Sequence, residues 1–222
     1  MTAILSSSTY VRVREVFDVL LERRLSNRSA SIVVLELFLG LGWLRAGVAK
    51  IISSSWWAGD TIVEFATENA DLTLPWYAPI IEHVIAPTVQ VVAAVTIVLQ
   101  LLIAASLLTG YFLPVGLFIA IALNINIIIA GGVDPSIFYL IMQAAILLWF
   151  LESRPPSQVL TRWVQLTFGA ALVVVLTSLP FIETLQPSGV IEDPAMVLVT
   201  FGGCLATGCA LIMARGRPGA NI

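Results

Sequence analysis

Three ionisable residues, Glu36, Arg45 and Lys50, lie within one apolar stretch of the sequence, residues 31–52. About 20 apolar residues in a helix span the hydrocarbon of a bilayer. A charged side chain near the centre of such a helix costs roughly 2.5–3.5 kcal/mol, and those that are retained commonly bind a ligand, relay protons or pair with another helix. These three residues are therefore the first candidates for a functional site.

Helix geometry separates the three charges. At 100° per residue, Glu36 and Lys50 fall on one face, and Arg45 faces about half a turn away from Glu36. Glu36 and Arg45 are also roughly 13 Å apart along the axis, so each needs a partner elsewhere. The glycines on the Glu36 face predict close packing of a neighbouring helix. The residues of that face recur at alternating spacings of four and three: Glu36, Gly40, Trp43, Gly47 and Lys50.

The elements that must position these residues are membrane helices. Hydrophobic residues make up 59% of the 222-residue chain and charged residues only 11%, with a mean hydropathy of +0.97. A soluble domain of ordinary composition carries about a quarter charged residues. We therefore predict an all-α, polytopic membrane helix bundle. The predicted spans are 31–52, 86–109, 111–131, 135–151, 163–182 and 194–214.

The distribution of charge predicts the orientation of this bundle. Outside the first span, every lysine and arginine falls in the N-terminal segment, in the connection after the fourth span or in the C-terminal tail. The other side of the predicted bundle carries nine acidic residues and no lysine or arginine. Because basic residues mark the cytoplasmic side, we expect both termini to be cytoplasmic, in the cytoplasmic membrane of a bacterium or archaeon.

Three parts of the chain are expected. Residues 1–30 form a cytoplasmic amphipathic segment, 31–151 form four transmembrane helices with an outer loop at 53–85, and 152–222 form two further transmembrane helices and a short tail. The N-terminal segment contains a predicted helix at 10–25 with an apolar face and several arginines. That helix is equally consistent with two roles: it lies on the inner leaflet, or it docks a partner protein.

The outer loop combines a predicted short helix at 60–69 with two aromatic clusters, Trp56–Trp57 and Trp76–Tyr77. Tryptophan and tyrosine prefer the membrane interface, so an aromatic belt that anchors the loop is the favoured interpretation. The alternative is an aromatic lid over a lipophilic ligand.

Depth in the predicted bundle suggests partners for the charges. Arg45, Lys50, Asn124, Asn126 and Gln143 are expected in the outer half, and Glu36 in the inner half, where Gln100 is the nearest polar side chain by depth. Amides that bond between membrane helices are often structural. With a buried arginine beside them, a ligand pocket is an equally good hypothesis.

Two segments, LELFLGLGWLRAGVAKI and ALNINIIIAGGVDPSIFYLIMQAAILLW, resemble the DoxX/DoxD-like membrane protein family. The second segment is similar to the DoxD branch, the small membrane subunit of thiosulfate:quinone oxidoreductase. The resemblance covers about residues 35–149 and implies a four-helix core, to which the fifth and sixth spans are additional. It further implies a quinone-linked oxidoreductase subunit, with Arg45 and Lys50 holding an anion or a quinone carbonyl and Asn124, Asn126 and Gln143 completing the pocket.

Redox groups within the chain have little sequence support. His83 is the single histidine, so we expect no bis-histidine haem and no metal site, and electrons would require a bound quinone or a partner subunit. Glu36 and His83 are the candidates for proton-linked roles. Two alternatives stay open: a small-solute or proton-coupled transporter using Glu36 and Arg45, and a scaffold that recruits redox partners. We expect the lipid bilayer as a partner and no nucleic acid, and an oligomer is compatible with these patterns.

Overall fold

The computed structural model describes residues 28–154, 157–184, 186 and 189–215, which form helices and turns without a strand. The all-α prediction is therefore confirmed for this part of the chain, and the helix predicted at 10–25 lies outside it. The longer helices are α2 (Ala30–Ile51), α4 (Asp60–Glu68), α6 (Val89–Thr109), α7 (Leu113–Ile129), α8 (Ser136–Glu152), α9 (Gln158–Ser178) and α11 (Pro194–Arg215). The shorter ones are α3 (Ser54–Ala58), η1 (Ala70–Leu72), α5 (Ala78–Ile80), η2 (Ile81–Ile85), η3 (Ala86–Thr88), η4 (Leu179–Phe181) and α10 (Gly189–Glu192).

Four helical stretches are long and apolar enough to cross a membrane: Ala30–Ile51, Ala78–Thr109, Gln158–Phe181 and Pro194–Arg215. The remaining two predicted spans correspond to α7 and α8, which have 17 residues each. At 1.5 Å per residue, each is about 26 Å long, at the lower limit for a transmembrane helix.

The start of the fifth span differs from the prediction. Helix α9 begins at Gln158, five residues before the predicted start at 163. The hydroxyl of Ser157 accepts a hydrogen bond from the Leu160 amide at 3.1 Å, which satisfies a free donor of the first turn. A polar capping residue, rather than the first apolar residue, therefore sets the start of this helix.

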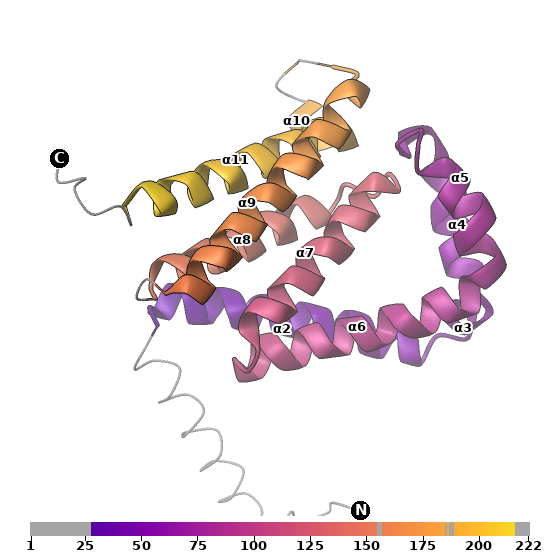
Figure 1. Ribbon diagram of the computed structural model, residues 1–222. Helices are drawn as coiled ribbons and strands as arrows, with labels where there is room; N and C mark the ends of the chain where they lie inside the picture. The colour runs from indigo at the N-terminus through magenta and orange to yellow at the C-terminus, as the bar shows by residue number, and fades with distance from the viewer. Residues whose placement is uncertain (1–27, 155–156, 185, 187–188, 216–222) are drawn as a thin grey trace, which may run out of the picture.

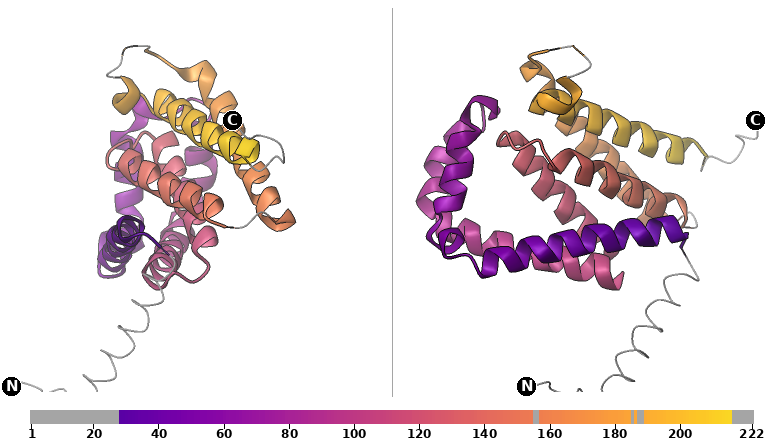
Figure 2. Two further views of the ribbon diagram at one scale, coloured as in Figure 1. Left: turned by 90° about the vertical axis from the view of Figure 1, so that its left-hand side faces the viewer. Right: turned by 180° about the vertical axis from the view of Figure 1, so that it is seen from behind.

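Helices α2 and α6 lie side by side and antiparallel (Figures 1 and 2). The face of α2 that carries Gly40 and Gly47 makes this contact. A Cβ atom built on Gly40 would lie 2.8 Å from Leu108 Cγ, and one on Gly47 would lie 3.1 Å from Leu101 Cδ2. The glycines are needed because larger side chains would hold the two helices apart.

Residues 53–85, here called the capping segment, cross the ends of α2 and α6 as a layer roughly perpendicular to them (Figure 1). Helix α4 matches the short helix predicted at 60–69. Trp56 Nε1 donates to the carbonyl of Ala93 on α6 at 3.1 Å, and Trp57 Nε1 donates to the carbonyl of Ile51 on α2 at 2.9 Å. The indole groups thus attach this segment to both long helices.

The far end of the capping segment is attached to α7. The Leu74 amide donates to the Ile129 carbonyl at 3.0 Å, and the Thr73 hydroxyl bonds to the Ala130 carbonyl at 3.3 Å. Gly131 adopts a positive φ of 91°, and its Cβ would lie 2.7 Å from the Asn69 carbonyl oxygen. This turn favours glycine both for its backbone conformation and for the close approach.

Helices α6 and α7 diverge from the turn that joins them, and the capping segment closes the wide end of the resulting V (Figures 1 and 2). Helices α9 and α11 pack on each other and on α8. The Asp193 carboxylate, just before α11, accepts a hydrogen bond from the Ala195 amide in the first turn of that helix at 2.8 Å. It also accepts one from the Glu183 amide, before α10, at 3.0 Å. The opposite end of the bundle, called the arginine-rich end, carries Arg28, Arg154, Arg162 and Arg215.

Candidate functional site

A cavity of about 260 Å³ lies beneath the capping segment, between the diverging ends of α6 and α7. Residues from α2, α3, α4, η2, α6 and α7 line it, so it exists only where the capping segment meets the bundle. Small-molecule sites are typically mostly apolar cavities of a few hundred Å³ with a few polar groups that fix orientation. The apolar lining includes Ile62, Phe65, Ile81, Leu123 and Ile127.

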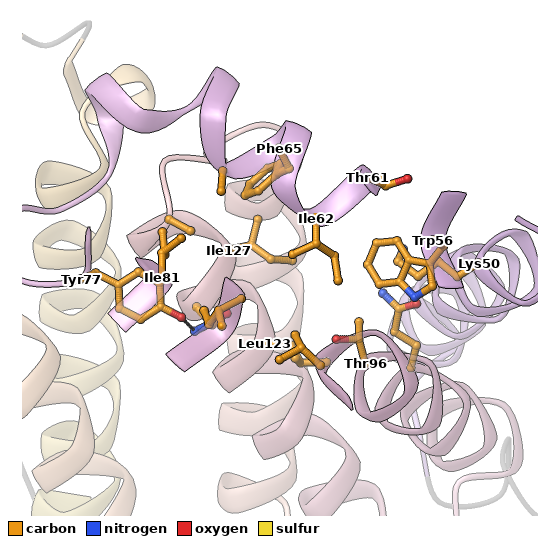
Figure 3. Close-up of a pocket in the computed structure, with 16 residues that line it drawn as sticks. Lys50, Trp56, Thr61, Ile62, Phe65, Tyr77, Ile81, Thr96, Leu123 and Ile127 are labelled. Carbon is orange, nitrogen blue, oxygen red and sulfur yellow. Dashed lines mark hydrogen bonds between the residues drawn. The ribbon is translucent and has the colours of Figure 1, made fainter. Parts of the chain in front are cut away.

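The polar residues of this cavity concentrate at its two ends (Figure 3). Tyr77 lies at one end, and Lys50 lies beside Trp56 at the other. Ile62 and Ile127 lie between the two ends, with only threonine hydroxyls as polar groups near them. The arrangement suits an elongated apolar molecule that has a polar atom at each end.

Lys50, Trp56 and Gln100 form the first polar end. The Lys50 ammonium lies over the Trp56 ring, 4.6 Å from its centroid, where the ring face stabilises the positive charge. The Gln100 side chain is buried, and its Oε1 has no hydrogen-bond partner among the described residues. A buried carbonyl oxygen without a partner costs about 1–3 kcal/mol, so this end of the cavity is suited to a polar ligand atom.

Tyr77 and Asn126 form the second polar end. Asn126 Nδ2 donates a hydrogen bond to the Tyr77 hydroxyl oxygen. The tyrosine hydroxyl keeps its own hydrogen available for an acceptor. Trp76 packs edge-on against the Tyr77 ring, with the ring centroids 5.5 Å apart. The second end therefore offers one hydroxyl donor held by an amide and an aromatic neighbour.

Arg45 is not brought to this cavity. Its side chain is exposed on the face of α2 that points away from α6, and it makes no ion pair with any residue that the structure describes. The predicted outer polar layer of five residues is therefore wrong in its grouping: Lys50 and Asn126 line the cavity, and Arg45 faces outward. The position is about 10 Å from the helix end, within the range in which a long side chain extends to the interface.

Asn124 and Gln143 also lie away from the cavity. They are almost completely buried between α7 and α8, where Asn124 Nδ2 donates to Gln143 Oε1 at 3.2 Å. Asn124 and Asn126 are two residues apart on α7, so their side chains point to different faces. The structure thus assigns Asn124 and Gln143 to the packing of two helices.

Glu36 is fully buried near the arginine-rich end and pairs with Arg28, whose Nη1 lies 2.5 Å from Glu36 Oε2. Gln100, the polar side chain predicted to be nearest to Glu36 by depth, lines the cavity and lies beside Gly47, where a built Cβ would be 3.6 Å from Gln100 Cβ. Arg28 is separated from Glu36 by about two helical turns and precedes α2 by two residues. Glu36 is therefore buried and paired, whereas Arg45 is exposed, so the two residues do not line one path across the bundle.

His83 is exposed on η2, with Nε2 4.0 Å from Glu82 Oε2 and no place in the cavity lining. Tyr77, Phe65, Thr96 and Ile81 are cavity residues that the sequence did not single out individually. The aromatic clusters of the outer loop were the available signal for Trp56 and Tyr77. No pattern in the sequence predicts that Trp56 contacts α6 while Tyr77 contacts Asn126 on α7.

The fold and composition define a helical membrane protein with a capped cavity at one end of its bundle. No family model, curated protein or solved structure matches the chain.

Proposed function

We propose that this chain is an integral membrane subunit that binds a quinone in the capped cavity and serves a quinone-linked oxidoreductase of the DoxD-like, thiosulfate:quinone type. The observation that carries the proposal is the placement of polar groups at both ends of an otherwise apolar cavity. A quinone ring has the matching pattern, with a carbonyl oxygen at each end and apolar edges between them.

The residues that line the cavity fit both the quinone and its reduced form, the quinol. Lys50 and the Tyr77 hydroxyl can donate to carbonyl oxygens, because an ammonium carries three donors and a phenol one. Gln100 can accept a hydroxyl hydrogen through Oε1 or, with its amide turned, donate through Nε2. A bound quinone supplies the capacity to take up electrons and protons, while the chain holds and orients it.

The proposed function includes an oxidoreductase partner and a place in the cytoplasmic membrane. The resemblance to the DoxD branch supports a soluble or membrane-bound oxidoreductase partner that delivers electrons. The arginine-rich end supports an orientation with that end in the cytoplasm of a bacterial or archaeal cell. The capped cavity then faces the outer half of the cytoplasmic membrane, and α7 and α8 cross the bilayer with the other four helices.

The test is quinone binding by the purified full chain in lipid nanodiscs, measured by calorimetry with a short-chain benzoquinone. Lys50→Met and Gln100→Leu should each weaken binding about tenfold, because each removes a hydrogen-bonding group from the cavity. Arg45→Gln is the matched control on the same helix and should bind like the wild type.

The proposal fails if the wild-type chain does not bind the quinone, or if Lys50→Met binds as tightly as the wild type. Loss of binding in Arg45→Gln alone would return the site to the exposed face of α2. Addition of thiosulfate and quinone to the complex isolated from its native membrane should reduce the quinone, and Lys50→Met should slow that reduction.

A further inference from the structure

A second cavity, of about 510 Å³, lies at the arginine-rich end between α8, α9 and α11. It shares no lining residue with the capped cavity. Arg154 and Arg215 lie at this second cavity, together with Glu152. All three residues lie at helix ends. Arg154 follows α8, Glu152 lies in the last turn of α8, and Arg215 lies in the last turn of α11.

The charges at this cavity do not cancel within the described residues. Arg215 Nη1 donates to Glu152 Oε1 in an exposed ion pair. Arg154 lies over the Phe150 ring, with its guanidinium carbon 4.4 Å from the centroid, and pairs with no carboxylate in the part of the chain that the structure describes. Two guanidinium groups therefore face one carboxylate, and the cavity keeps an excess positive charge.

Polar groups from α9 add to these charges. The helix begins beside the cavity, and its fourth and eighth residues, Thr161 and Gln165, contribute to the lining. The amino-terminal end of a helix carries a partial positive charge, which favours an anion next to it. The positive dipole end of α9 and both arginines thus act on the same space.

The remainder of the cavity is apolar. Leu160, Val164, Ile212 and Met213 line it below the arginines. Arginines beside this apolar lining match a molecule with an anionic head and hydrocarbon chains.

We propose that this cavity binds the phosphate headgroup of an anionic phospholipid, with its acyl chains against the apolar lining formed by α9 and α11. Guanidinium groups bind phosphate oxygens through paired hydrogen bonds, and basic cavities between membrane helices on the cytoplasmic side bind anionic headgroups. A free phosphate ion would use the arginines but not the apolar surface, so the lipid is the occupant that uses both parts of the site.

Native mass spectrometry of the purified full chain tests this proposal with phosphatidylglycerol and with zwitterionic phosphatidylcholine. The wild type should retain phosphatidylglycerol preferentially. The double variant Arg154→Gln/Arg215→Gln should lose at least about tenfold in affinity for it, since each arginine near an anionic surface contributes roughly fivefold. Arg45→Gln removes one arginine from the other half of the bundle and should retain the preference.

A second variant separates charge from folding. Arg154→Lys/Arg215→Lys keeps both charges and should keep most of the preference for phosphatidylglycerol. Equal binding of the two lipids by the wild type, or unchanged binding in the double glutamine variant, would overturn the proposal. Displacement of phosphatidylglycerol by millimolar inorganic phosphate would overturn the lipid assignment, because the acyl chains would then contribute nothing.

Discussion

At the scale of single residues, the charges of the first membrane helix have separate explanations. Glu36 is neutralised inside the bundle by Arg28, Lys50 lies against an aromatic ring at the cavity, and Arg45 faces outward. A buried carboxylate is tolerated in an apolar bundle only when a cation and hydrogen bonds offset its lost hydration. The first helix therefore combines one packing pair with one candidate ligand-binding group.

The Arg28–Glu36 pair makes a stability prediction. Arg28→Ala should lower the free energy of unfolding by about 2 kcal/mol or more, because it removes a counter-charge from a buried carboxylate. Denaturant unfolding in mixed micelles measures the change, and the double variant Arg28→Met/Glu36→Met should recover part of it. Arg45→Ala, on the exposed face of the same helix, is the control that should change little. If Arg28→Ala is as stable as the wild type, this ion pair does not contribute to the free energy of unfolding.

The Asn124–Gln143 hydrogen bond predicts a different outcome. Asn124→Leu should cost about 1–2 kcal/mol of stability, because the buried Gln143 oxygen loses its donor. Asn124→Leu/Gln143→Leu should be nearly as stable as the wild type, since both polar groups are then absent. Quinone affinity should be unchanged in both variants. A large loss of quinone affinity in the single variant would place Asn124 in the ligand site instead.

These residues also mark what the sequence could predict about the site. Lys50 and Asn126 were predicted as ligand-binding candidates, and both line the cavity. Depth along the helix axes could not assign Asn124 and Asn126 to different partners, because residues at similar depth can point to different faces. The pairing of Glu36 with Arg28 was not predicted, since hydropathy places Arg28 outside the span and says nothing of its reach back toward the helix.

At the scale of helices, the glycines of α2 predict a local test of packing. Gly40→Val should destabilise the protein by about 1–3 kcal/mol, because its side chain would collide with Leu108 on α6. Gly203→Val is the matched control on α11, where a Cβ meets no atom within 4 Å. Thermal unfolding in the same detergent compares the two variants. Equal effects at both positions would argue against close contact between α2 and α6.

Helix positions were predicted well because each long apolar run needs internal backbone hydrogen bonds in lipid. The glycine face of α2 was also predicted correctly as a contact surface, since small residues at a regular spacing permit close approach. The capping segment was harder. Its short helix at α4 follows from local sequence, but its attachment to α7 depends on the Leu74 and Thr73 hydrogen bonds, which join residues more than fifty positions apart.

At the scale of the whole molecule, the two ends of the bundle have opposite character. The capping segment carries acidic residues and covers one cavity, and the arginine-rich end carries the other. Basic residues remain on the side from which a membrane helix is inserted. The charge difference therefore supports an orientation of the six apolar helices in which the arginine-rich end lies on the side of insertion and the capping segment on the opposite side.

Cysteine labelling tests that orientation. In a chain with both native cysteines replaced by alanine, Glu68→Cys on the capping segment should react with a membrane-impermeant maleimide added outside intact cells. Ser153→Cys, after α8, should react only after the membrane is opened. Both positions are exposed, so burial does not limit the reaction. Labelling of both from the same side would contradict the three membrane crossings by α6, α7 and α8 that separate the two positions.

Photolabelling locates the bound quinone on the chain. A photoreactive benzoquinone should label the purified chain on the cavity residues of α4 and α7, within residues 61–66 and 123–130, as identified by peptide mass spectrometry. Excess unlabelled quinone should suppress this labelling, and so should Lys50→Met. Labelling confined to α9 and α11, or labelling that excess quinone leaves unchanged, would contradict quinone binding in the capped cavity.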